Sequence, residues 1–342
     1  MPTSTARPRT IGRIRAAVDL LRPRTLFRTL ARVDSVVDDV RALKSQVDQL
    51  TIRIEQLTAI QRLNWEQADD QAQLDALDAA RIGQHIDAAV RTASMELEPF
   101  PHTVITNWLP SDVYDIVIRA VPPPVFFADR EERRQRLIVP FDLAPAFSQS
   151  VWRFVSQEVI GGSLCRALNE KFAPVIRTYI STFCPQLPLD IDLTLHASDG
   201  RIMLRRPGYV IEPHRDPKWG FLTGLVYLVR KGDNEAYGTQ LYRVRDDVEA
   251  PSGKPHYVDR SRCELVKSIP FRPNTLLVFL NSTGAHGASI PSDAVPADLT
   301  RLVYQFRLGP SEHAMQQLLS HMPPENRSAW AGSKMDRVGT YD

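Results

Sequence analysis

The 342-residue sequence has little cysteine and no long apolar run. Its three cysteines, Cys165, Cys184 and Cys263, are too few for a disulfide framework and lack the paired spacing of a zinc ribbon. No run of about 18 apolar residues occurs, so no segment is expected to span a bilayer. The N-terminus also lacks the continuous apolar core of a secretory signal. These absences predict a reducing, cytoplasmic setting.

Net charge is small but unevenly distributed. Lys and Arg number 42 and Asp and Glu number 40, yet residues 1–32 hold eight arginines against one acid, Asp19. This basic arm also contains apolar side chains, which favours peripheral contact with an anionic membrane. Nucleic-acid binding, a solvated arm and an organelle transit peptide are the alternatives. No specific nucleic-acid binding is predicted for the chain.

Residues 33–63 have the clearest periodicity in the sequence. Heptad positions a and d hold Val40, Leu43, Val47, Leu50, Ile54 and Leu57, with the β-branched residues at a and the leucines at d. This pattern favours a parallel two-stranded coiled coil. We therefore expect a homodimer formed through residues 36–57. The alternative is a single amphipathic helix that packs on its own globular domain.

The sequence changes character after Pro99 and Pro101, which end the helical stretch. Residues 101–121 predict a strand, a turn and a helix, and residues 143–184 are helical in pattern. From residue 186 onward, seven or eight short alternating runs are separated by Gly, Pro, Asp and Asn. Such runs predict a β-sandwich or barrel. No P-loop, Gly-rich dinucleotide motif or nucleophile elbow is present.

The strand-rich part contains a candidate metal site. His214 and Asp216 are two residues apart in YVIEPHRDP, so both side chains leave an extended backbone on the same side. His286 follows the buried-strand pattern TLLVFL, and a sandwich can bring the two segments together. Two histidines and one carboxylate leave three coordination positions open, as in non-haem Fe(II) oxygenases. A structural zinc site would instead be closed by four ligands.

A buried cation is predicted beside this site. Arg301 begins the alternating strand RLVYQFRL, in which Arg301, Val303, Gln305 and Arg307 share one face. An inward-facing arginine is costly unless an anion meets it, and a dicarboxylate would supply that anion. A surface position or an ordinary ion pair is the alternative for Arg301. Arg307 is the second candidate for the anchor.

These segments in combination resemble the Fe(II)- and 2-oxoglutarate-dependent oxygenases, in particular the prolyl-hydroxylase-like branch. The resemblance covers residues 99–310 and lies in RRPGYVIEPHRDPKWGFLTGLVYL, YGTQLYRV, TLLVFLNSTGAHGAS and TRLVYQFRL. It implies an α+β fold in which a double-stranded β-helix, a jelly-roll variant, is flanked by helices and preceded by the long helix or coiled coil. The expected parts are a basic arm (1–32), a coiled-coil segment (33–98), a dioxygenase domain (99–312) and a C-terminal helix and tail (313–342).

The resemblance also implies roles for individual residues. Fe(II) would be held by His214, Asp216 and His286, and the distal carboxylate of 2-oxoglutarate by Arg301. Tyr227 and Tyr209 would face the cosubstrate, although either tyrosine could equally be a core aromatic. Ascorbate is a candidate additional cofactor, and Lys218 and Trp219 are candidate substrate contacts.

The implied reaction is hydroxylation of an unactivated C–H bond, with release of succinate and CO2. The expected substrate is a glycan precursor or a peptidyl side chain. Two other functions are compatible with the sequence. One is a zinc-dependent hydrolase that uses the same three ligands, and the other is a non-catalytic interaction protein built on the coiled coil.

Overall fold

The computed structural model describes ten stretches of the chain. These stretches are residues 23–66, 70–127, 144–182, 184–188, 191–216, 220–247, 256–281, 283–294, 299–324 and 327. Most of the basic arm, the end of the C-terminal tail, and Lys218 and Trp219 lie outside them. The chain divides into two compact units, Met1–Thr58 and Ala59–Asp342.

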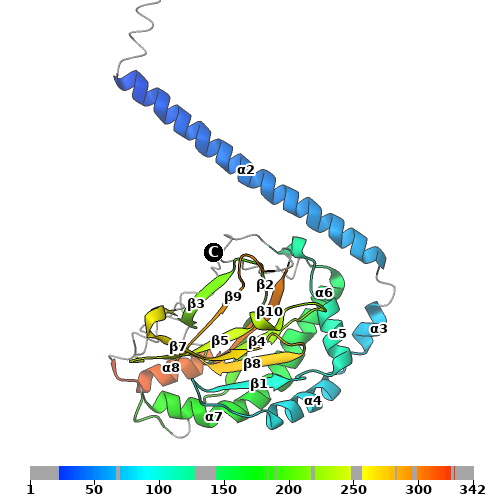
Figure 1. Cartoon of the computed structure of the whole chain (residues 1–342), viewed down its shortest axis with the longest axis vertical. Helices are drawn as coiled ribbons and strands as arrows, with labels where there is room; N and C mark the ends of the chain where they lie inside the picture. Colours follow the sequence, from blue (N-terminus) through cyan, green and yellow to red (C-terminus); the bar gives the residue numbers. More distant parts are fainter. Residues whose placement is uncertain are drawn as a thin grey trace, which may run out of the picture. The chain divides into compact units, whose positions relative to one another are not determined.

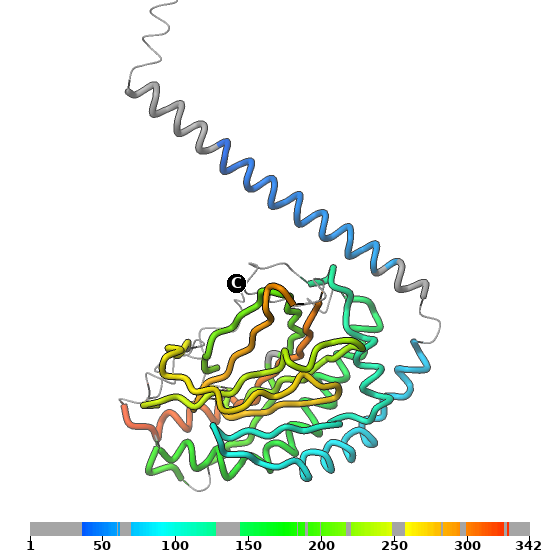
Figure 2. The backbone as a smooth tube through the Cα atoms, viewed as in Figure 1, coloured from blue at the N-terminus to red at the C-terminus, as the bar shows by residue number. Residues whose placement is uncertain are grey.

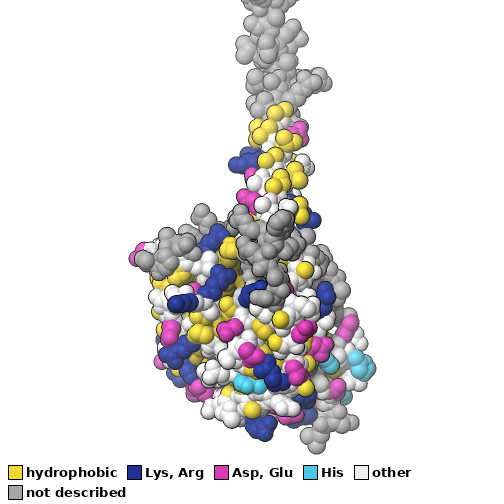
Figure 3. Space-filling view, turned by 90° about the vertical axis from the view of Figure 1, so that its right-hand side faces the viewer, with side chains coloured by type: hydrophobic (Ala, Val, Ile, Leu, Met, Phe, Trp, Pro, Cys, Tyr) yellow, Lys and Arg dark blue, Asp and Glu magenta, His cyan; other side chains and the backbone are white. Residues whose placement is uncertain are grey.

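Helix α2, Pro23–Glu66, supplies the described part of the first unit (Figure 1). The predicted a and d side chains from Val40 to Leu57 are between 54% and 64% exposed. Figure 3 shows apolar side chains following one another along the visible face of this helix. The helix therefore has an apolar face that its own unit does not cover. The homodimer through residues 36–57 stays a prediction. Among the described residues, no helix combines the length and apolarity needed to cross a bilayer.

The second unit contains two sheets and several helices, which pack against the first of them, sheet A below. Its α-helices are α3 (Asp70–Asp75), α4 (Ala79–Thr92), α5 (Ser111–Arg119), α6 (Ala146–Phe154), α7 (Cys165–Ser181) and α8 (Glu312–His321). A π-helical stretch, η3 (Val155–Leu164), joins α6 to α7, and three single 3-10 turns are η1 (Pro124–Phe126), η4 (Glu235–Tyr237) and η5 (Arg260–Arg262).

Helix α4 belongs to this packed body. The Asp78 carboxylate caps the helix by accepting hydrogen bonds from the backbone N–H groups of Ala80 and Arg81. Ile82, Ile86 and Val90, spaced by four residues, are each at most 2% exposed. Within the predicted helical segment 33–98, α2 thus has an exposed apolar face, whereas the apolar face of α4 is buried.

Two five-stranded sheets, antiparallel in every pair, make up the rest of the unit. Sheet A has the order β1 (His102–Thr106), β8 (Thr275–Leu280), β4 (Leu222–Tyr227), β10 (Arg301–Pro310) and β2 (Leu195–Arg205). Sheet B has the order β6 (His256–Tyr257), β3 (Val210–Arg215), β9 (Ala285–Ser289), β5 (Thr239–Val244) and β7 (Cys263–Ile269). The predicted mixture of helices with antiparallel β-structure is confirmed.

The two faces of sheet A have different surroundings. Leu302, Tyr304 and Phe306 of β10 belong to the large core shared with the helices. Val303 belongs instead to a second core that includes Leu241 of sheet B. Because side chains alternate along a strand, the remaining odd-numbered residues of β10 also face sheet B. The polar side chains described next are held in this space between the sheets.

Candidate metal centre and its pocket

The structure brings together the three predicted metal ligands. His214 lies on β3, Asp216 follows the end of that strand, and His286 lies on β9. Strands β3 and β9 run side by side although they are far apart in the sequence (Figure 2), and His214 and His286 are directly paired across them. One ligand atom from each of the three residues lies within 4.8 Å of the others. All three residues are buried.

Each imidazole faces a different oxygen of the carboxylate. His214 Nε2 is 3.8 Å from Asp216 Oδ1, and His286 Nε2 is 4.0 Å from Asp216 Oδ2. His214 Nδ1 donates a hydrogen bond to the Glu212 carbonyl at 3.0 Å. A carbonyl can only accept, so this bond places the proton on Nδ1 and leaves the Nε2 lone pair for a metal ion.

Asp216 is held by three neighbouring side chains of sheet A. The Thr223 hydroxyl donates to Oδ2 at 2.7 Å, and Gln305 Nε2 donates to the same oxygen at 3.5 Å. Arg307 Nη2 donates to Oδ1 at 3.3 Å. The carboxylate is therefore fixed in orientation before a metal ion binds.

The protonation states suit metal binding. Burial raises the pKa of Asp216, but the charge of Arg307, the two imidazoles and the Thr223 hydrogen bond outweigh it and hold that pKa below its ordinary value. Burial, reinforced by His214, lowers the pKa of His286 to about 3. The carboxylate is thus ionised and the imidazole neutral near neutral pH, as metal coordination requires. These donors fit a divalent ion with an open coordination face.

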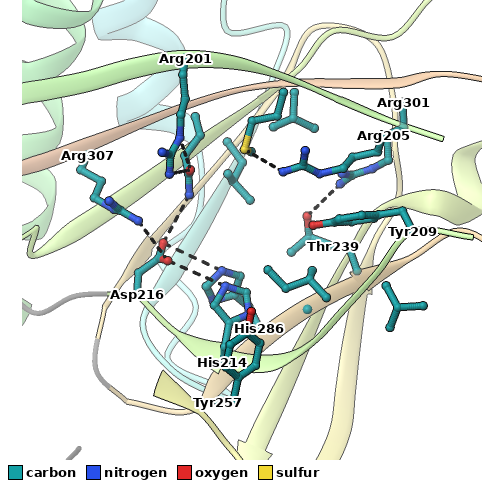
Figure 4. A pocket seen from close by; sticks show the side chains of 18 residues that line it. Arg201, Arg205, Tyr209, His214, Asp216, Thr239, Tyr257, His286, Arg301 and Arg307 are labelled. Atoms are coloured by element: carbon teal, nitrogen blue, oxygen red, sulfur yellow. Dashed lines mark hydrogen bonds and ion pairs between the residues drawn. The ribbon is translucent and has the colours of Figure 1, made fainter. Parts of the chain in front are cut away.

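Arg301 lies at the other end of the same pocket (Figure 4). Its side chain is buried, and Nη2 donates a long hydrogen bond of 3.4 Å to Thr239 Oγ1. Its guanidinium carbon is 5.0 Å from the Phe271 ring centroid and 5.7 Å from that of Tyr227. Nε has no hydrogen-bond partner, and no acidic side chain pairs with Arg301 among the described residues. A buried cation in this state requires an anion.

The two predicted tyrosines differ in position. Tyr209 lines the pocket. Tyr227 lies just behind the lining, completely buried, and its hydroxyl donates to Thr239 Oγ1 at 2.7 Å. Tyr227 therefore acts on the pocket through Thr239 and the Arg301 guanidinium rather than by lining it.

Several pocket residues were missed by the sequence analysis. They are Arg201, Arg205 and Thr239, with Gln305 assigned only to a shared strand face and Arg307 considered only as the second candidate for the anchor. Thr223, which does not line the pocket but donates to Asp216, was also missed. The alternation in RIMLRR, which puts Arg201, Met203 and Arg205 on one side, was a usable signal for the first two. The same reasoning would have placed Thr223 on the face of Tyr227.

The sequence matches no protein-family model and no curated protein. Among solved structures, the chain is similar to the non-heme alpha ketoglutarate dependent carbocyclase SnoK from nogalamycin biosynthesis, with 11% identity over 68% of this chain and 86% of that chain and a TM-score of 0.37. It is similar to a Pseudomonas putida prolyl-4-hydroxylase, with 16% identity over 66% and 98% and a TM-score of 0.37. It is also similar to HygX from Streptomyces hygroscopicus with nickel and 2-oxoglutarate bound, with 15% identity over 62% and 83% and a TM-score of 0.36.

Proposed function

We propose that the protein is an Fe(II)- and 2-oxoglutarate-dependent oxygenase whose two sheets form a double-stranded β-helix. The observation that carries the proposal is one pocket that contains a two-histidine, one-carboxylate triad and a buried arginine without an acidic partner among the described residues. The triad alone would suit other metal chemistry. The Arg301 guanidinium in addition requires an anion that enters with the metal. A zinc-dependent hydrolase does not need such an anion.

In this proposal His214, Asp216 and His286 hold the iron, and Arg301 binds the distal carboxylate of 2-oxoglutarate. The Thr239 hydroxyl, fixed by Tyr227, orients the same carboxylate. When bound, iron with 2-oxoglutarate and dioxygen would supply the oxidising chemistry: one oxygen atom would pass to the substrate and the other to succinate, which would leave together with CO2. The chain contributes positioning: Arg307, Gln305 and Thr223 hold Asp216, and the apolar side chains of Leu225 and Val303 line the space between the two ends. The reaction we assign is oxidation of an unactivated C–H bond by hydroxylation.

Removal of a metal ligand tests this assignment. His214→Ala should lower the affinity for Fe(II) at least tenfold, measured anaerobically. In air, the same variant should form no succinate from 2-oxoglutarate in an Fe(II)-dependent manner. His313→Ala, on the exposed face of α8, is the control and should match the wild type. Normal succinate formation by His214→Ala would refute the oxygenase. Zinc rather than iron in the protein purified anaerobically, with no 2-oxoglutarate binding, would favour the hydrolase.

A second proposal concerns helix α2. We propose that it pairs in parallel with α2 of a second copy of the chain through residues 36–57. The exposed a and d side chains support this pairing, and so does the charge pattern. In a parallel pair Asp39 occupies a g position and Lys44 the e position that faces it on the partner helix, so opposite charges meet. For the basic arm we propose peripheral contact with an anionic membrane.

A further inference from the structure

One of the side chains that hold Asp216 is itself held by a charged residue. Gln305 Oε1 accepts hydrogen bonds from Arg201 Nε at 3.1 Å and from Arg201 Nη2 at 2.8 Å, while Gln305 Nε2 donates to Asp216 Oδ2 at 3.5 Å. Dashed lines in Figure 4 lead from Arg201 through this one side chain to Asp216. The Gln305 amide therefore lies between a guanidinium at its oxygen and a carboxylate at its nitrogen.

Both neighbours favour the same orientation of the amide. If the amide were rotated by half a turn, its oxygen would face the Asp216 carboxylate and its NH2 group would face the Arg201 guanidinium, and both contacts would be repulsive. In the observed orientation, the positive charge at one end and the negative charge at the other polarise the amide, so that each hydrogen bond strengthens the other. Arg201 thus supports the bond that Gln305 makes to the metal ligand.

The backbone beside this contact is irregular. Arg201 and Gln305 are directly opposite each other across β2 and β10, but Arg307 is opposite Ser198, so two residues of β2 stand opposite Phe306 alone. Such a β-bulge re-aims the side chains next to it, and bulges are common beside active sites. The bulge here directly adjoins the pair that forms the contact. This placement fits a pair that serves the pocket better than one that serves only the sheet.

We propose that Arg201 is a positioning residue of the metal centre: it fixes the amide of Gln305, and the amide fixes the carboxylate of Asp216. The inference rests on the oxygenase proposed above and extends its metal centre from the side chains that contact Asp216 to one that acts through them. Outer partners of this kind set the orientation and the basicity of a ligand, and therefore the affinity for the metal ion. The alternative is a cross-strand pair that stabilises only the sheet.

A double-mutant cycle separates these two roles. Co2+ is titrated into the full chain, and its binding is followed by visible absorption, which needs neither iron nor a substrate. Gln305→Met should weaken Co2+ binding roughly 10-fold, because Asp216 loses a donor. Arg201→Met should weaken it about three- to tenfold. The double variant should stay within about twofold of Gln305→Met, because no amide is left for Arg201 to fix.

Three further measurements exclude a merely structural effect. Arg201→Lys keeps a charged donor for the Gln305 oxygen and should recover part of the lost affinity. The absorption bands of bound Co2+, which depend on the arrangement of its ligands, should shift in Arg201→Met. The 2-oxoglutarate affinity of the Co2+-loaded variant should stay within about threefold of the wild type, since Arg301 lies at the other end of the pocket. Arg166→Met, at an exposed ion pair with Asp87, is the matched control and should match the wild type throughout.

Three outcomes would overturn the inference. Unchanged Co2+ affinity in Arg201→Met would leave the pair with a role in the sheet alone. An effect of Arg201→Met that is as large in the Gln305→Met background would show that Arg201 does not act through the amide. An equal loss of Co2+ and 2-oxoglutarate affinity in Arg201→Met would mean that the residue supports the pocket as a whole. If the wild type binds Co2+ but not 2-oxoglutarate, the oxygenase is refuted instead, and the cycle still decides whether Arg201 acts through Gln305.

Discussion

At the residue scale, the two candidate anchors of the cosubstrate are distinguished by what each arginine contacts. Arg307 donates to a carboxylate oxygen of Asp216, so its charge already has a partner. Arg301 meets aromatic rings and the Thr239 hydroxyl, with no acidic side chain among the described residues. Burial accordingly lowers the pKa of Arg301. The sequence could place both arginines on one strand face by alternation. The partners of the two arginines could not be predicted from the sequence. Asp216 follows β3 and Thr239 lies on β5, and the local sequence pattern does not show how these strands lie against β10.

Substitution of Arg301 tests its role as the anchor. Arg301→Met should raise the dissociation constant of 2-oxoglutarate roughly 100-fold, since the substitution removes a charge-assisted contact from a buried site. Metal affinity should stay within about threefold of the wild type, because the guanidinium contacts no metal ligand. Calorimetry with the Zn2+-loaded protein measures both constants. Arg272→Met, at an exposed ion pair with Glu235, is the control. Unchanged 2-oxoglutarate binding in Arg301→Met would transfer the role to Arg307.

At the scale of elements, the site depends on the close approach of β3 and β9. The side chain of Arg215, next to the ligands, forms an ion pair with Asp247 and donates to the Gly284 carbonyl at 2.8 Å. The Asp247 carboxylate accepts a hydrogen bond from Gly284 N at 2.9 Å. Gly284 is the last residue of the turn before β9, the strand that carries His286. The strand pattern around His286 was visible in the sequence. The contacts among Arg215, Asp247 and Gly284 could not be predicted from the sequence, because they join three segments that are distant along the chain.

Gly284 therefore offers a test at this scale. It has φ +60, and a Cβ there would lie 2.1 Å from a Phe100 ring carbon and 2.9 Å from the Tyr242 carbonyl oxygen. Gly284→Ala should lower the free energy of unfolding by roughly 1–3 kcal/mol and should also weaken metal binding by displacing His286. Gly232→Ala is the matched control: it has φ +96, with nothing within 4 Å of the added carbon. Denaturant titration should show the smaller loss for Gly232→Ala, with unchanged metal affinity. Equal effects of the two changes would contradict the argument.

At the scale of the whole molecule, the chain combines a packed body with a helix that exposes its apolar face. The heptad pattern covers the part of α2 whose a and d side chains are exposed, Val40 to Leu57. The sequence could not show where the body begins, because Ile82, Ile86 and Val90 would suit a partner helix as well as they suit the chain's own core. Their burial means that removal of residues 1–98 would strip α4 from the core. Point changes in α2 are therefore the better test of self-association.

Leu50→Asp should convert a dimer into a monomer, because a carboxylate at a d position has no favourable place in the seam of a parallel coil. Gln49→Asp puts the same charge at the neighbouring c position, which faces away from the seam, and should leave the dimer intact. Sedimentation equilibrium of the full chain measures the mass of each variant. Metal and 2-oxoglutarate affinities should be the same in both, since the ligands and Arg301 all lie in the second unit. If the wild type is a monomer, the pairing of α2 is refuted, and the apolar face of α2 is left for a different partner. If metal or 2-oxoglutarate affinity changes in Leu50→Asp, the site depends on the dimer.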